Sequence, residues 1–273
     1  MLLALDCEDG SVQAQHRMPT GEDFLPRQAE AGFEALFQLL EVKHGGPVDR
    51  AEVAVGLSIP GLVDPDTGII VMAPDAQNLV GWHPAASPVL AGVRSVAVAN
   101  DIEAATHYAQ KESPGVRNMG ILMLGTGLGA SYVVDGQFLR GRSGFAGEFG
   151  LVPMGDDGLT LDRLVGGKHM LREAGLSHLN TMEFVRRVEA SDADALALLD
   201  SRSKALGWAV AATIQIFNPE RVYLGGGMLR WPGFFEHAVA IAKNRTIPEM
   251  WADCEVVLAD RPGHVPALGA AIA

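Results

Sequence analysis

The sequence predicts an α/β fold made of two similar halves. Strand and helix patterns alternate over the first 110 residues, and a second alternation starts near Gly120. Each half begins with two strands joined by a turn, at Asp9-Gly10 in the first half and at residues 125–129 in the second. These observations indicate a duplicated α/β unit with a cleft between the halves.

In the first half, strands are indicated by short apolar runs and helices by three-to-four-residue spacing. Phe33 and Phe37 belong to an apolar helical stripe that Gly45-Gly46-Pro47 ends. Glu22 and Asp23 are expected to open this helix, because acidic residues favour its positive end. The expected strands are residues 2–5, 11–17, 52–59, 68–72 and 95–99, and the second expected helix is residues 101–111.

The second half contains one long helix among shorter elements. It is expected over residues 192–217, capped by Ser191 or Asp192 and stopped by Asn218-Pro219. The other expected helices are residues 161–176, 181–189, 234–243 and 266–273, and the expected strands are residues 120–124, 130–134, 221–224 and 254–258.

Composition and charge exclude several classes of protein. The 273 residues include 21 Lys and Arg against 33 Asp and Glu, a formal charge of −12. This acidity argues against binding to nucleic acid or to an anionic membrane surface. A long apolar stretch, residues 205–217, contains Gly207 and Gln215 and is shorter than the roughly 20 residues that a membrane span needs. No basic region opens the chain, so we expect no signal peptide.

Cysteine and histidine usage argues against a structural metal site or a disulfide framework. Cys7 and Cys254 lie far apart, and no C-x-x-C pattern occurs. The eight histidines show neither H-x-H nor H-E-x-x-H spacing. A reduced, cytoplasmic compartment fits this composition.

Two glycine-rich segments could bind an anion. In Gly125-Thr126-Gly127-Leu128-Gly129, alternate glycines let backbone N–H groups converge on a phosphate. No lysine follows as in a Walker loop, and a strand rather than a helix follows, unlike a dinucleotide-binding fingerprint. The alternative is a hairpin that binds nothing. Gly225, Gly226 and Gly227 follow a strand and could accept a phosphate or a nucleoside, or form a tight connection.

Two acidic positions could contact a substrate. Asn100-Asp101 stands where a strand ends and a helix begins, so Asp101 could be a general base toward a hydroxyl, or a helix cap. Glu148 lies among small residues and could accept hydrogen bonds from a polyol, or be solvated.

Taken in order, these segments resemble the family of repressors, open reading frames and sugar kinases called ROK. The resemblance runs from about Val53 to the end of the chain. It implies a two-lobed, actin/hexokinase-like (ribonuclease H-like) kinase fold with a central cleft for ATP and sugar. The segments that carry it are residues 56–64, 73–74, 78–82, 98–101, 124–129, 144–150, 223–227 and 267–271. The N-terminal lobe would be residues 1–112 and the C-terminal lobe residues 113–273, with the last helix, about 266–273, returning to the N-terminal lobe.

The resemblance also implies roles for single residues. Asp101 would take the proton from the attacking sugar hydroxyl. The sugar hydroxyls would be held by Asn100 and Glu148, with Gly61 close by. The nucleotide would be bound by Gly125, Thr126 and Gly127 at its phosphates and by Gly225, Gly226 and Gly227 at its adenosine. Phosphoryl transfer needs mainly positioning, charge neutralisation and a base, which agrees with these residue types.

The sequence departs from the family pattern in three places. Family kinases open with a strand ending in Asp-x-Gly-Gly-Thr, whose Asp helps to hold Mg²⁺; here Asp6 stands in a degenerate segment, or that first strand is missing. We expect a start site placed too far downstream, or true degeneration. The family's zinc motif is absent, because Leu151 replaces its His and residues 153–162 contain no Cys. Asp162 replaces a family Glu and could reach a sugar hydroxyl, or act as a helix N-terminal acid.

The sequence therefore predicts a sugar kinase that uses ATP and Mg²⁺, without zinc, on a hexose or hexose derivative. A catalytically impaired sugar-binding relative is the alternative. A transcriptional regulator is disfavoured, because only about 50 residues precede Val53 and they already belong to the first lobe. The expected partners are a small sugar and ATP, with no nucleic acid and no membrane, and the resemblance allows a homodimer.

Overall fold

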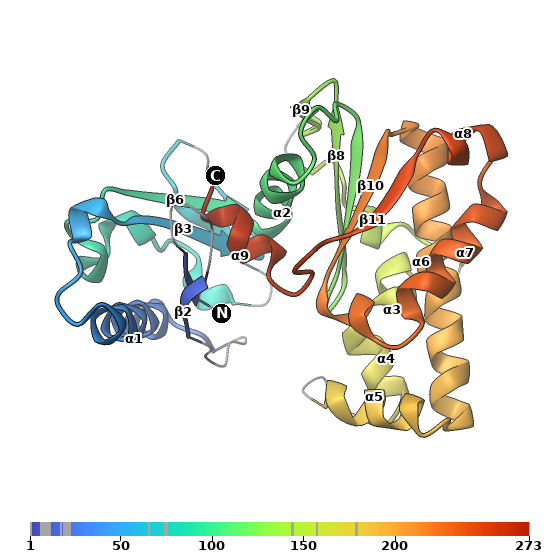
Figure 1. Cartoon of the computed structure of the whole chain (residues 1–273), viewed down its shortest axis with the longest axis horizontal. Helices are drawn as coiled ribbons and strands as arrows, with labels where there is room; N and C mark the ends of the chain where they lie inside the picture. Colours follow the sequence, from blue (N-terminus) through green and yellow to red (C-terminus); the bar gives the residue numbers. More distant parts are fainter. Residues whose placement is uncertain are drawn as a thin grey trace. The chain divides into compact units, whose positions relative to one another are not determined.

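The computed structural model describes residues 2–5, 12–16, 18, 23–64, 66–73, 76–142, 145–156, 158–177 and 180–272. The chain divides into two compact units (Figure 1). Unit 1 contains Met1–Tyr108 together with Pro266–Ala273, and unit 2 contains Ala109–Val265.

The described strands of unit 1 form three separate two-stranded sheets. β3 and β6 run parallel, from Ala54 opposite Ser95 to Ile59 opposite Asn100. The other two sheets are antiparallel pairs, β1 with β2 and β4 with β5. The strands are β1 (Leu2–Leu5), β2 (Val12–His16), β3 (Ala54–Ile59), β4 (Leu62–Val63), β5 (Ile70–Met72) and β6 (Ser95–Asn100).

Helix α1 (Pro26–His44) supplies much of the core of unit 1. Phe33 and Phe37 are buried with Leu57 of β3. The helix begins later than predicted: proline favours the first turn, and Asp23 lies exposed outside the helix. Gly45 ends α1 in the left-handed conformation, as the sequence predicts. Short 3₁₀ helices follow at η1 (Arg50–Glu52), η2 (Gln77–Leu79), η3 (Pro84–Ala86) and η4 (Pro88–Leu90).

The C-terminal helix α9 (Val265–Ala270) packs into unit 1 from Pro266 onward, beside β3 (Figure 1). Two glycines make the contact possible. A Cβ at Gly56 would overlap the carbonyl oxygen of Ala270, and one at Gly269 would overlap that of Ala104 in α2 (Asp101–Lys111). The helix therefore lies backbone against backbone on β3 and on the first part of α2.

Unit 2 is built on one five-stranded sheet in the order β11-β10-β7-β8-β9. β7 runs parallel to β10 and antiparallel to β8, and all six residues of β7 are buried. The strands are β7 (Met119–Leu124), β8 (Leu128–Val134), β9 (Gln137–Phe138), β10 (Arg221–Gly225) and β11 (Glu255–Leu258).

Long helices cover this sheet. α6 packs along α7 (Figure 1), and Leu206 and Phe234 are fully buried in the core. Asp192 caps α6 by accepting a hydrogen bond from the Ala195 N–H at 2.9 Å. The helices are α3 (Leu161–Val165), α4 (Gly167–Glu173), α5 (Thr181–Glu189), α6 (Ala193–Phe217), α7 (Phe234–Arg245) and α8 (Pro248–Ala252), with 3₁₀ helices η5 (Phe149–Leu151) and η6 (Gly227–Arg230).

The predicted α/β class is confirmed by this mixture of parallel strands and covering helices. None of the helices in the described ranges combines the length and apolar character that crossing a membrane requires.

Candidate functional site

In unit 1, Asn100 joins the end of β6 to the start of α2. Its Oδ1 accepts hydrogen bonds from the N–H groups of Ile102 at 2.8 Å and Glu103 at 3.3 Å, so Asn100 caps the helix. Its Nδ2 donates to the carbonyl oxygen of Gly61 at 2.6 Å. The structure thus brings together Asn100, Asp101 and Gly61, three of the residues predicted to lie at the sugar.

Asp101 is the first residue of α2 and is partly exposed. Its Oδ1 lies 3.0 Å from the N–H of Ile102, a donor that it shares with Asn100. Because Asn100 also accepts from the N–H of Glu103, Asn100 caps the first turn of α2. The catalytic role of Asp101 stays a prediction.

In unit 2, the glycine turn between β7 and β8 is held by backbone hydrogen bonds. The carbonyl oxygens of Gly125 and Thr126 accept from the N–H groups of Gly167 at 3.0 Å and Lys168 at 3.1 Å. These bonds come from the junction of α3 and α4, where Gly166 is extended. The single helix predicted over residues 161–176 was therefore wrong, because the chain leaves the helical path at Gly166 to bond the turn.

The second glycine segment runs alongside the first. β10 is parallel to β7, with Gly225 opposite Met123. Gly226 has φ +117°, and a Cβ there would overlap the carbonyl oxygen of Leu124. Residues 225–227 and the turn that begins at Gly125 therefore lie next to each other, at the carboxyl ends of two parallel strands, where α/β sheets commonly bind ligands.

Two of these glycines have no packing reason to be glycine. Gly125 and Gly227 have no positive φ, and a Cβ on either would meet nothing within 4 Å. At Gly127 and Gly226, by contrast, a Cβ would overlap other atoms of the protein. Gly125 and Gly227 thus leave space beside adjacent backbone segments, into which a ligand could approach closely.

Asp162 contacts the glycine turn directly. Its Oδ1 accepts a hydrogen bond from the N–H of Leu128 at 2.6 Å, and its Oδ2 lies 4.0 Å from Nε2 of His169. Burial lowers the pKa of His169, an effect that the nearby Arg163, Arg172 and Lys168 increase and that Asp162 opposes. The sugar contact predicted for Asp162 stays a prediction.

Glu148 is exposed in a loop that rests on β8. A Cβ at Gly147 or Gly150 would overlap the carbonyl oxygens of Ala130 and Leu128, respectively. Both glycines therefore allow the backbone of the loop to pack directly against the strand. Glu148 is thereby held beside β8, in unit 2 with the glycines predicted to bind the nucleotide. Leu151, at the position of the family's His, is 63% exposed.

Sequence reasoning missed Lys168. Its backbone is anchored to Thr126, its side chain is exposed, and it has no ion-pair partner among the residues that the structure describes. The pair Gly166-Gly167 inside a predicted helix was the local signal that could have revealed this junction.

The described residues contain no group of three His, Cys, Asp or Glu side chains that could hold a metal. Asp6, the Mg²⁺ candidate, lies outside the described residues. Mg²⁺ use, the absence of zinc and a homodimer stay predictions.

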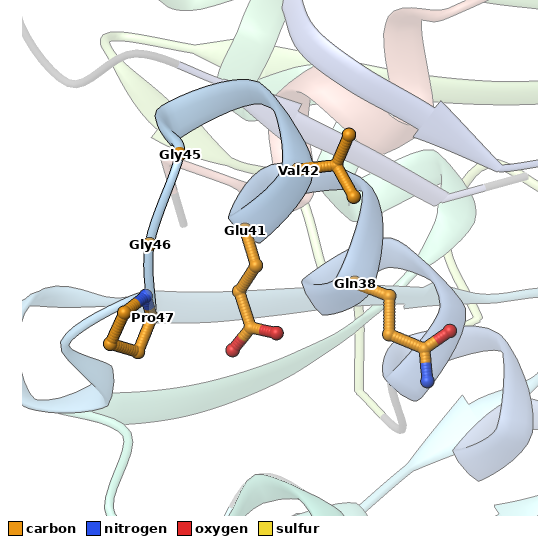
Figure 2. Close-up of a pocket in the computed structure, with 6 residues that line it drawn as sticks. All are labelled: Gln38, Glu41, Val42, Gly45, Gly46 and Pro47. Atoms are coloured by element: carbon orange, nitrogen blue, oxygen red, sulfur yellow. The ribbon is translucent and has the colours of Figure 1, made fainter.

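A hollow of about 710 Å³ at the end of α1 contains none of the predicted site residues (Figure 2). It is lined by Gln38, Glu41, Val42, Gly45, Gly46 and Pro47.

Comparison with known proteins bears on the family and the fold of this chain. A glucokinase from Halalkalibacterium halodurans is 28% identical over 226 residues, which cover 71% of this chain and 67% of that protein. A ROK hexokinase structure from Thermus thermophilus has a TM-score of 0.69 at 26% identity and covers 96% of this chain and 90% of that one.

A ROK family glucokinase from Streptomyces griseus, solved with glucose and AMPPNP, has a TM-score of 0.77 at 20% identity. It covers 98% of this chain and 93% of that one, and confirms the predicted actin/hexokinase-like fold. The family model described as "ROK family" matches residues 2–273. With the family model matched over nearly the whole sequence, this chain belongs to the ROK family.

Proposed function

We propose that this chain is a sugar kinase that transfers the γ-phosphate of ATP to a hydroxyl of a hexose or hexose derivative. The observation that carries the proposal is the space beside Gly125 and Gly227, on two neighbouring backbone segments at the carboxyl ends of β7 and β10. Neither glycine is required by the packing of the protein, so a ligand that approaches the backbone closely explains both.

Unit 2 would bind the nucleotide. The N–H groups of Thr126 and Gly127 are donors of the kind that bind phosphate oxygens, and residues 225–227 would line the adenosine. The N–H of Gly125 donates to the carbonyl oxygen of Gly127 at 2.9 Å, so Gly125 would contribute the open space beside its Cα. Lys168, exposed and anchored at Thr126, would add positive charge in a chain of net charge −12. Mg²⁺ bound with ATP would neutralise further phosphate charge; Asp6 is its candidate carboxylate.

Unit 1 would supply the base. Asp101 would take the proton of the acceptor hydroxyl while the hydroxyl oxygen bonds to the γ-phosphorus. The bond from that phosphorus to the β–γ bridging oxygen breaks, and its electron pair leaves with ADP. Phosphoryl transfer requires an aligned nucleophile and a proton acceptor, and a carboxylate can accept the proton.

Asn100 would hold a sugar hydroxyl as a donor. A carboxamide has two N–H groups and one oxygen with two lone pairs. The oxygen already accepts two hydrogen bonds, and one N–H is used by Gly61. The second N–H has the capacity to bind a hydroxyl oxygen of the sugar. Glu148 would accept from another hydroxyl.

The test is ADP release from Mg²⁺-ATP across a panel of hexoses and N-acetylhexosamines. We expect ADP release that depends on one class of sugar. A sugar that raises the Tm without ADP release would identify the sugar-binding alternative instead, because a ligand stabilises the folded state even when no reaction follows.

A further inference from the structure

Asp162 lies where four segments of unit 2 meet. Its side chain contacts Leu128 at the start of β8, and its Cβ lies 3.4 Å from where a Cβ of Gly150 would stand. Its carbonyl oxygen accepts from the N–H of Gly166 at 2.7 Å, which ends α3. Its Oδ2 faces His169 of α4.

We propose that Asp162 is a positioning residue for the nucleotide: it holds the glycine turn in the shape that binds phosphate. This inference rests on the proposed function, since it assigns the turn to ATP. It differs from the sugar-hydroxyl role that the sequence resemblance implies for the same residue.

The carboxylate fixes the turn from β8. Leu128 is the first residue after Gly127 and is buried, so its N–H needs an acceptor, and Asp162 Oδ1 provides one at 2.6 Å. The same oxygen overlaps the place where a Cβ of residue 127 would stand, so a side chain at position 127 would displace the Asp162 carboxylate. A Glu at position 162 would add a methylene to this tight contact, and overpacking of that kind displaces the backbone.

The backbone of Asp162 fixes the turn from the other side. By accepting from Gly166, it ends α3 at the point from which Gly167 and Lys168 donate to the carbonyl oxygens of Gly125 and Thr126. The two sides of the turn are therefore both set by Asp162 and its junction, and displacing Asp162 would move the N–H groups expected to bind phosphate.

The contacts of the carboxylate connect it to the glycine turn and to the α3–α4 junction. Oδ1 is bonded to Leu128, and Oδ2 faces a His169 ring whose neighbours include Arg163, Lys168 and Arg172. All of these residues belong to the turn or to the α3–α4 junction. The carboxylate is 30% exposed, and both its oxygens already have a neighbouring group of unit 2.

The experiment compares Asp162→Ala, Asp162→Glu and Asp162→Asn in steady-state kinetics, with KM for ATP and KM for sugar measured separately. ADP binding by calorimetry provides a readout that does not require turnover. We expect Asp162→Ala and Asp162→Glu to raise KM for ATP and the Kd for ADP about tenfold or more. In Asp162→Ala a buried N–H loses its acceptor, and in Asp162→Glu the longer side chain displaces the backbone. KM for sugar should stay within about twofold, as it reports on contacts of another residue set.

Asp162→Asn separates positioning from bulk stability, because its amide oxygen can still accept from Leu128 at the same length. We expect its KM for ATP to lie closer to the wild type than those of the other two variants. Asp156→Ala is the matched control, since Asp156 is exposed in the preceding loop of unit 2. If Asp162→Ala does not fold, Asp162→Glu and Asp162→Asn decide the question.

The outcomes separate the inference from the proposed function. A rise in KM for sugar with unchanged KM for ATP would overturn the inference and return Asp162 to the acceptor site, and no change in either would also overturn it. A wild-type protein that binds ADP but releases none with any sugar would overturn the proposed function alone, and the Kd for ADP of the variants would still decide the inference. A wild type that binds no ADP would overturn both.

Discussion

Each unit contains one part of the candidate site, which we call its half-site. In unit 1 the half-site is Asn100 and Asp101 after β6, and in unit 2 it is the glycine segments after β7 and β10. The strands that lead into the two half-sites differ in burial and in ladder partners. Ala99 is the one buried residue of β6, and β3 is its one ladder partner among the described strands. Every residue of β7 is buried between β8 and β10. The half-site of unit 1 therefore stands on a half-exposed pair of strands, and that of unit 2 on a fully buried sheet.

The difference shows which groups hold each half-site in place. In unit 1, one side chain does most of this work, because Asn100 both caps α2 and ties it to Gly61. In unit 2, glycines and the backbone hydrogen bonds from residues 167 and 168 hold the half-site in place. Substitutions at Asn100 or Asp101 should therefore change the chemical step or local stability, whereas substitutions in the glycine segments of unit 2 should change the affinity for ATP.

The largest effect is expected from Asp101→Asn. Removing a general base lowers kcat by about 10²–10⁴, and KM for ATP should change little because the residues proposed to bind the nucleotide lie in unit 2. The measurement is ADP release at saturating ATP and sugar. Glu112→Gln, at an exposed position just after α2, is the control. An unchanged kcat in Asp101→Asn would remove Asp101 from the catalytic role.

Gly125→Ala tests the space in the turn of unit 2. A methyl group there meets no protein atom, so we expect an unchanged Tm but a rise in KM for ATP of about tenfold, on the order of 1.4 kcal/mol. Gly127→Ala is the matched comparison, because its Cβ would overlap Asp162 and should lower the Tm as well. If Gly125→Ala binds ATP as well as the wild type, the space beside Gly125 does not hold a phosphate.

Lys168→Gln is expected to have a smaller effect on the same half-site. An exposed ion pair is worth up to about 1 kcal/mol, so KM for ATP should rise up to about fivefold. The rise should shrink in high salt, and Lys168→Arg should restore most of the affinity. Lys243→Gln, in the last turn of α7, controls for the loss of one positive charge. An equal effect in both Gln variants would show a general effect of net charge rather than a phosphate contact.

The sequence correctly placed the glycine turn at residues 125–129 between two strands and residues 225–227 at the end of a strand. Alternate glycines and flanking apolar runs are local signals, so neighbouring residues were enough for these predictions. It also placed Asn100 and Asp101 correctly at the boundary between β6 and α2. It could not reveal the break at Gly166, because the N–H groups that follow, of Gly167 and Lys168, donate to carbonyl oxygens of Gly125 and Thr126, about 40 positions earlier. The contact of Asp162 with Leu128 was hidden for the same reason: a carboxylate's partner far along the chain leaves no local pattern.

Asn100→Ala tests whether one side chain holds the half-site of unit 1. Loss of an N-cap costs about 0.5–2 kcal/mol in the free energy of unfolding, measured by denaturant titration. Asn100→Ser keeps a capping oxygen but loses the bond to Gly61, so it should lose less stability than Ala. Equal losses in the two variants would mean that the cap contributes nothing and that the Gly61 bond matters.

The smallest effect is expected at His169 of unit 2, and it concerns pH. Its pKa is lowered, chiefly by burial, with Arg163, Arg172 and Lys168 adding to the shift and Asp162 opposing it. The unfolded chain therefore binds a proton more readily than the folded one as the pH falls below about 6.5, and the free energy of unfolding decreases in that range. His169→Gln removes this one contribution and leaves the other histidines to titrate in both proteins. The Tm of the wild type should thus fall more between pH 7.5 and pH 5.5 than the Tm of His169→Gln, in matched buffers. An equal or steeper fall in the variant would show that protonation of His169 does not weaken the segment that holds the glycine turn.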